Sequence, residues 1–148
     1  MSNVLEICIA DRSGDGMINV TSIEAVANKG IINDRYFKDK NEVDTQITLI
    51  ESENIDNYNA ESGSNISYIS FRRNIITQGI KLNELEDKKL LIGKVRIKVH
   101  RLCNPCRYLH EKLKQKNLVK KIINRSGLRC EILTSGKILI DDKIKIIN

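Results

Sequence analysis

The chain has 148 residues, enough for one domain with a hydrophobic core, and its four irregularly spaced cysteines do not suggest a secreted disulfide framework. The formal charge of +6 invites nucleic-acid binding, but aromatic residues make up only 4% of the chain, so a base-stacking surface is not expected. The sequence shows no signal peptide and no apolar stretch of transmembrane length. We therefore expect a single domain over residues 1–148 that lies in the cytoplasm and binds neither nucleic acid nor membrane.

Three apolar segments in the first half of the chain predict strands. They cover residues 4–10, 20–27 and 45–50, and the last alternates with the period of a strand. Residues 11–18 resemble the start of an EF-hand calcium loop, because oxygen-bearing side chains alternate there before a glycine. Ser22 stands where the closing glutamate of that loop should be, so a hairpin turn is the better prediction.

A helix is predicted to follow the third strand, with Ser52 as its cap and Tyr58 near its end. Residues 59–65 are polar and predict a loop. Residues 95–99 alternate between apolar and basic side chains, which predicts a strand with one buried face.

The last third of the chain predicts two helices and then strands. The helical segments cover residues 106–116 and 118–123, and the second ends near Gly127. Residues 128–146 contain three apolar runs separated by turns and predict a meander. Many short strands without a repeated strand–helix–strand alternation favour a closed or nearly closed β-barrel, mainly β with a few short helices.

The strand over residues 95–99 leads into the most informative motif of the chain, Cys103-Asn104-Pro105-Cys106. Pro105 suits the first turn of a helix, so Cys106 is predicted near a helix N-terminus, where unpaired N–H groups favour the thiolate. A thiolate is both a nucleophile and a soft metal ligand. Cys103 is close enough in sequence to share a disulfide or a metal with Cys106.

Three other interpretations of the two cysteines stay open. A structural zinc site takes four ligands, and only His100 and His110 flank the motif, on different predicted elements. A thioredoxin-like redox motif belongs to a strand–helix–strand unit that the sequence does not predict. Both thiols could also be inert small residues of the core.

Five blocks of the chain together resemble the MOSC domain, a family named after the C-terminal domain of molybdenum cofactor sulfurase. They occur in the order and approximate spacing of that family, over most of the chain from Val20 to Ile146. The blocks are residues 30–36, 46–50, 71–75 with 79–82 and Leu85, 92–95 and 103–106.

The resemblance implies a β-barrel in which Cys106 carries sulfur as a persulfide or ligates the molybdenum of a bound pterin cofactor. Guanidinium groups suit the phosphate of such a pterin, because their planar forks donate bidentate hydrogen bonds. The residues that match the family's Asp-Arg motif and its arginine-rich segment near the cofactor are Asp34, Arg35, Arg72, Arg73 and Asn74.

Two features depart from the family pattern. Asn33 stands where the family usually has glycine, which changes the local turn because glycine alone adopts every backbone conformation freely. Cys103 is an additional thiol, which could resolve a persulfide on Cys106 as a disulfide or be silent. Without the resemblance, the arginines would be interpreted as surface or salt-bridged residues and Asn74 as a turn residue.

The leading hypothesis is a molybdenum-cofactor-associated protein that carries sulfur on Cys106 or binds the molybdenum–pterin cofactor through it. Its partners would be a cysteine desulfurase-type sulfur donor or molybdenum-cofactor enzymes. The alternatives are a molybdenum-dependent reductase of N-hydroxylated compounds, which would need a separate electron donor, and a non-catalytic cofactor-delivery module. Whether the protein is an enzyme, and its oligomeric state, stay open.

Overall fold

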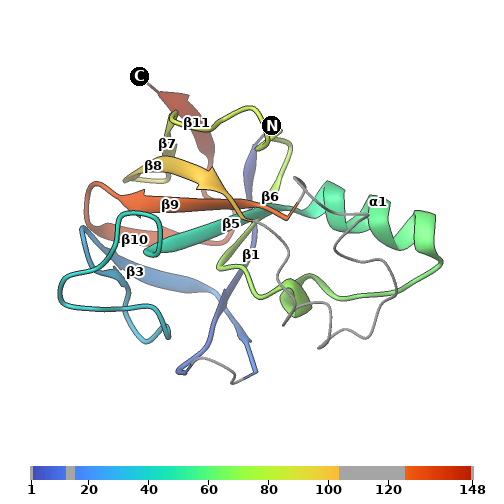
Figure 1. The fold of residues 1–148 in the computed structure, drawn as a ribbon, viewed down its shortest axis with the longest axis horizontal. Coiled ribbons are helices and arrows are strands. Elements are labelled where there is room, and N and C mark those ends of the chain that lie inside the picture. The colour runs from blue at the N-terminus through green and yellow to red at the C-terminus, as the bar shows by residue number, and fades with distance from the viewer. Residues whose placement is uncertain (1, 13–15, 104–125, 148) are drawn as a thin grey trace.

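Short strands form two sheets in the computed structural model, which describes residues 2–12, 16–103 and 126–147 (Figure 1). One α-helix, α1 (Ser52–Ser62), and one 3-10 helix (Tyr68–Phe71) complete the elements of these ranges. The strands are β1 (Asn3–Ile9), β2 (Ile18–Val20), β3 (Ser22–Val26), β4 (Gly30–Ile31), β5 (Ile47–Glu51), β6 (Ile75–Gln78), β7 (Lys89–Ile92), β8 (Val95–Leu102), β9 (Leu128–Ile132), β10 (Gly136–Leu139) and β11 (Ile144–Ile147).

The larger sheet has the strand order β11-β7-β8-β9-β5-β6-β1-β2, and the smaller one the order β10-β3-β4. The larger sheet curls so far that Asn3, in β1, pairs with Lys143, next to the opposite edge strand β11. At the same seam the Val4 N–H donates to the Asp142 carbonyl, and the Val4 carbonyl accepts from the Asp141 N–H, each at 2.9 Å. The prediction of a mainly β, nearly closed barrel is confirmed.

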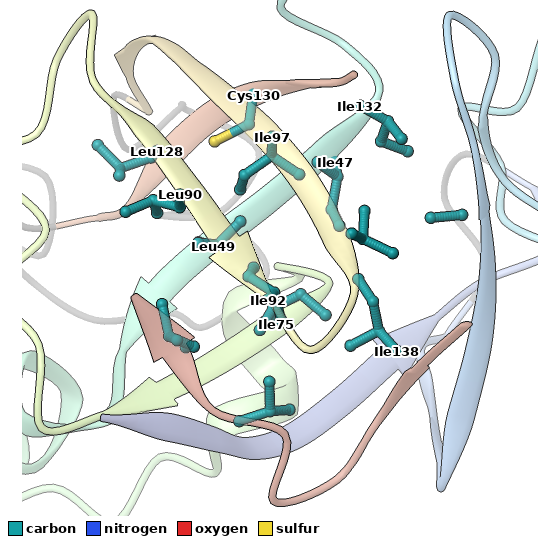
Figure 2. Close-up of a cluster of buried hydrophobic side chains, with 14 of the residues drawn as sticks. Ile47, Leu49, Ile75, Leu90, Ile92, Ile97, Leu128, Cys130, Ile132 and Ile138 are labelled. Carbon is teal, nitrogen blue, oxygen red and sulfur yellow. The ribbon is translucent and has the colours of Figure 1, made fainter. Parts of the chain in front are cut away.

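Aliphatic side chains from both sheets fill the interior of the barrel. Val95, Ile97 and Val99 of β8 are fully buried there, while the basic residues between them face outward, as predicted. Figure 2 shows that side chains from β5, β8, β9 and β10 meet in this space. Burial of this apolar surface is the main source of the stability of the fold.

A second apolar cluster lies on the outer face of the large sheet. Cys8 of β1, Ile50 of β5 and Ile76 of β6 pack there against Ile55 and Tyr58 of α1. Because successive side chains of a strand point to opposite faces, these residues alternate with those of the interior. β5 is therefore buried on both faces, although its alternating pattern indicates only one buried face.

The helix α1 connects β5 to β6, and these two strands pair in parallel. The chain thus contains one strand–helix–strand unit that the sequence analysis did not predict. α1 begins at Ser52, but Glu51 is the N-cap residue and makes no side-chain cap bond. The expectation that Ser52 caps the helix is therefore wrong by one position.

The loop predicted over residues 59–65 begins too early, because α1 continues to Ser62; Gly63, with a φ of 69°, is the C-cap residue, and residues 63–65 lie outside the helix. The Ser62 hydroxyl donates to the Tyr58 carbonyl at 2.7 Å. The Asn59 side chain bonds both backbone groups of Ile66, at 2.9 and 3.0 Å. Polar side chains at these positions thus support a helix end instead of a loop.

The strands predicted over residues 128–146 exist, but the meander is wrong. β9 pairs with β8 and β5, β10 with β3, and β11 with β7. The Thr134 hydroxyl accepts the Arg96 N–H, and the Ser135 hydroxyl accepts the Ala27 N–H, both at 2.9 Å. These bonds turn the chain from one sheet into the other, so the turn in the sequence marks a change of sheet.

Two further predictions concern the segments at the edges of the described ranges. β1 and β2 pair with Ile9 opposite Ile18, so the hairpin predicted around residues 11–18 is confirmed. The helices predicted over 106–116 and 118–123 lie outside the described residues. Within the described ranges, no helix is both long and apolar enough to cross a membrane.

Candidate functional site

Asp34 and Arg35 form a buried ion pair shortly after β4. Arg35 Nη1 lies 3.4 Å from Asp34 Oδ1, and the two side chains are 3% and 0% exposed, respectively. The Ala10 N–H donates to the same Asp34 oxygen at 3.1 Å. Asp34 Oδ2 is buried and has no hydrogen-bond partner among the described residues. The Asp-Arg motif is therefore built into the fold instead of being displayed on its surface.

The Arg35 guanidinium ties three segments together. Its Nη2 donates to the Arg72 carbonyl at 3.1 Å, and its Nη1 lies 3.0 Å from the Met17 sulfur. The guanidinium carbon also lies 4.4 Å from the centre of the Tyr36 ring, a cation–π distance. Arg35 is thus placed to act on the site through Arg72.

Arg72 has an unusual backbone. Its φ is 61°, a left-handed conformation that costs a residue with a side chain about 1–3 kcal/mol. The Arg72 N–H donates to the Ile69 carbonyl at 3.1 Å, and the Arg35 guanidinium holds the Arg72 carbonyl. These contacts fix the start of the arginine-rich segment in one conformation.

Arg73 links this segment to the other end of the chain. Its Nε donates to the Ser126 carbonyl at 2.9 Å, and the Ser126 hydroxyl donates to the Cys103 carbonyl. The Cys103 N–H donates in turn to the Gly127 carbonyl at 2.7 Å. Residues 103 and 126 therefore lie side by side, with the Arg73 guanidinium next to them.

This junction depends on Gly127. Its φ is 101°, and a Cβ at this position would lie 1.9 Å from the Leu49 carbonyl oxygen. Any other residue would push β9 away from β5, so glycine is required for a close backbone approach. The sequence analysis placed the end of a helix near Gly127; the residue immediately precedes β9, and the predicted helix itself lies outside the described residues.

Asn74 joins three strands of the large sheet. Its Oδ1 accepts the Thr48 N–H at 3.0 Å and the Thr48 hydroxyl at 3.1 Å. Its Nδ2 donates to the Cys8 carbonyl at 3.2 Å, and its own N–H donates to the Thr48 hydroxyl at 3.0 Å. The side chain is buried, so these bonds position the residues next to it.

The described site residues thus belong to one connected network. Arg35 contacts Arg72, and Arg73 reaches Cys103 through Ser126. Cys106, the predicted reactive thiol, lies outside the described residues. Within the described ranges, no group of three or more His, Cys, Asp or Glu side chains is arranged to hold a metal ion.

The three described thiols are all buried. Burial raises the pKa of Cys8 to about 12, with a smaller contribution from Glu6. Burial also raises the pKa of Cys130, and Cys103 is close enough to add to this effect. Cys8 and Cys130 are therefore held as neutral thiols in the fold, where the thiolate is scarce.

Sequence reasoning missed the residues that hold the site in place. Thr48 was assigned only to a strand, and Ser126 and Met17 received no role. A hydroxyl in an otherwise apolar run is a weak signal for a buried hydrogen bond, because such a group needs a partner. The contacts of Met17 and Ser126 span distant parts of the chain, and no local pattern predicts them.

Comparisons with known proteins place this geometry in context. A model of the MOSC domain matches residues 33–145. A comparison of the sequence with curated proteins finds no match.

Among solved structures, YuaD from Bacillus subtilis is 16% identical with a TM-score of 0.85, and the match covers 99% of this chain and 96% of that one. YiiM from Geobacillus stearothermophilus is 16% identical with a TM-score of 0.81, over 100% and 76% of the two chains. YiiM from Escherichia coli is 15% identical with a TM-score of 0.75, over 100% and 70%. At these identities the likeness is one of fold.

Proposed function

The chain belongs to the MOSC domain family, which is associated with molybdenum-cofactor proteins, and we propose that it carries sulfur on Cys106 or binds the molybdenum–pterin cofactor through that thiol. One observation supports this proposal above the others. The buried Arg35–Arg72 tie and the Arg73–Ser126 bond bring the arginine-rich segment to the point where the chain leads into the Cys-Asn-Pro-Cys motif.

The arginine-rich segment fits an anionic ligand. Arg73 donates its Nε–H to the Ser126 carbonyl. Among the described residues, no carboxylate forms an ion pair with the Arg73 guanidinium. Its remaining N–H groups can therefore donate a charge-assisted, bidentate bond to a phosphate. Arg72, whose backbone is held by Arg35, adds a second positive charge. These two arginines would hold the phosphate end of the pterin.

Cys106 would supply the soft ligand or the nucleophile. It follows Cys103 by three residues, so its Cα lies within about 11 Å of the Cys103 Cα by chain length alone. Cys103 contacts Ser126, which is the hydrogen-bond partner of Arg73, so a thiolate three residues further along the chain can serve the other end of a ligand whose phosphate the arginines hold. When bound, the cofactor supplies the redox chemistry of molybdenum, while the protein supplies binding and orientation.

Sulfur transfer to Cys106 needs no external oxidant. The Cys106 thiolate attacks the terminal sulfur of a persulfide on a cysteine desulfurase-type donor. A new S–S bond forms on Cys106, the S–S bond of the donor breaks, and the donor leaves as a thiolate. The same thiolate chemistry would not be available to Cys8 or Cys130, whose pKa values are raised by burial.

Native mass spectrometry tests the proposal. The parent protein and Cys106→Ala are expressed in a host that makes molybdenum cofactor, with Cys130→Ala as a matched control that removes a core thiol. We expect a pterin, molybdenum or extra-sulfur adduct on the parent and the control, and none on Cys106→Ala.

Two outcomes redirect the proposal. A pterin adduct that survives in Cys106→Ala would contradict a role for this thiol and favour a cofactor-delivery module. A molybdenum adduct that oxidises a chemical reductant when an N-hydroxylated compound is added would identify the reductase instead of the sulfur carrier. Three proteins that each show only the mass of their own sequence, with no adduct, would contradict both forms of the proposal.

A further inference from the structure

Arg129, the second residue of β9, was not among the predicted site residues. Its neighbours Leu128 and Cys130 are fully buried in the interior, so Arg129 points to the outer face of the sheet. Its Nε is nevertheless buried and has no hydrogen-bond partner in the described part of the chain. Buried polar groups of folded proteins are nearly always paired, and a charged one more so.

A second arginine stands directly opposite it. In the pairing of β8 with β9, Arg101 faces Arg129, and like charges at facing positions destabilise a sheet. Arg101 has its own counter-ion, because its Nε donates to Asp44 Oδ2 at 2.7 Å. That bond, more than any other contribution, lowers the pKa of Asp44. Among the described residues, no carboxylate forms an ion pair with Arg129.

Thr48 of β5 lies between Arg129 and the arginine-rich segment. On its other side Arg129 faces Thr48, and Thr48 exchanges three hydrogen bonds with Asn74. Asn74 follows Arg73 directly in the chain. Ser126, which accepts the Arg73 Nε–H, lies three residues before Arg129. Arg73 and Arg129 therefore flank one region of the outer face.

We propose that Arg129 binds an anionic oxygen group of the ligand, a phosphate, on the outer face of the sheet beside Arg73. The inference rests on the proposed function and names a further residue of the same site. Nε–H and a neighbouring Nη–H of a guanidinium form a side-on fork that matches two phosphate oxygens. An anion there satisfies the orphaned Nε and separates the like charges of Arg101 and Arg129.

The test is isothermal titration calorimetry of the full chain with inorganic phosphate. Arg129→Gln removes the charge and the fork, and Arg96→Gln is the matched control, because Arg96 is an exposed arginine on the neighbouring strand β8. We expect Arg129→Gln to weaken phosphate binding about tenfold or more and Arg96→Gln to change it less than twofold. Equal losses in the two variants would reduce the effect to net charge and overturn the proposal, as would unchanged binding by Arg129→Gln.

Arg129→Lys provides a second readout, in case Arg129→Gln does not fold. It keeps the charge but lacks the fork, so phosphate should bind more weakly than to the parent, and phosphate should raise the midpoint of thermal unfolding less. Full binding by Arg129→Lys would contradict bidentate recognition. Cys106→Ala should bind phosphate like the parent. Failure of the adduct experiment with intact phosphate binding would therefore remove the proposed function of Cys106 and leave the role of Arg129 standing.

Discussion

The interior of the barrel and the region around Asp34, Arg35, Arg72 and Asn74, called the polar end here, are held together by different forces. The interior contains aliphatic side chains from both sheets, which gain stability by leaving water and tolerate small changes of shape. The polar end contains a buried ion pair, a left-handed arginine and a buried asparagine, each tied by directional bonds. Such groups are costly to bury, so each of them depends on its hydrogen-bond or ion-pair partner to keep the fold stable.

The largest expected effect comes from Arg35→Met, which removes the partner of a fully buried carboxylate. The buried Asp34 carboxyl would lose its charged partner, and the Arg72 carbonyl would lose its donor. We expect the free energy of unfolding in urea to fall by about 3–5 kcal/mol. Arg96→Met, at an exposed position, should change it by less than about 0.5 kcal/mol. Similar small losses in both variants would show that the ion pair is not a structural tie.

Asn74→Ala tests the hydrogen bonds that the Asn74 side chain makes to Thr48 and Cys8. The change leaves the Thr48 N–H and the Cys8 carbonyl without their side-chain partner in a buried place. We expect a loss of about 2–4 kcal/mol in the free energy of unfolding, since each unpaired buried group costs about 1–3 kcal/mol. Asn83→Ala, at an exposed site, is the control. A loss no larger than that of the control would contradict the account.

Ile97→Val tests the tolerance of the interior. The side chain is fully buried, and the change removes one methylene from a large apolar cluster. The free energy of unfolding should fall by about 1 kcal/mol. Differential scanning calorimetry or urea unfolding measures it. A loss that exceeds that of Asn74→Ala would reverse the comparison between the two regions.

Glu51 tests whether burial of a carboxyl group affects stability when no arginine pairs with it, because it is buried outside the arginine network. Burial raises its pKa above the usual value of 4.5, opposed by a bond from the Leu82 N–H. The folded protein therefore holds the proton more tightly than the unfolded chain. The resulting stability is present below the unfolded pKa and is lost as the pH rises through the raised one.

Glu51→Gln should therefore gain stability relative to the parent as the pH rises from acid to neutral. The effect is the smallest of the four, and urea unfolding at two pH values measures it. Glu84→Gln, at an exposed position, is the control. A difference between Glu51→Gln and the parent that is the same at both pH values would show that burial of this carboxyl is not linked to pH.

The strands could be predicted from the sequence because their alternation is local. Residues 95–99 have the predicted buried and exposed faces. Their partners could not be predicted, because pairing depends on contacts between distant segments, as the displaced β10 shows. The helix α1 was predicted too short, since the Asn59 side chain supports its end by bonding the backbone of Ile66, seven residues further on.

The contacts of the candidate site residues could not be predicted from the sequence. The sequence named Arg35 and Asn74, yet no pattern could show that both are buried and tie other segments. Arg129 looked like any charged residue of an alternating strand, and only the buried Nε distinguishes it. Charge patterns show which groups are available, whereas the fold decides which of them are buried and which contacts they make.

The central claim, that the arginine-rich end of the sheet binds the molybdenum–pterin cofactor, has one direct test. The intact protein is weighed by native mass spectrometry after expression in two hosts, one that makes the cofactor and one that cannot. We predict an additional mass of one pterin per chain from the first host only, and its loss in Arg73→Gln but not in Arg96→Gln. Equal masses from both hosts would contradict the claim.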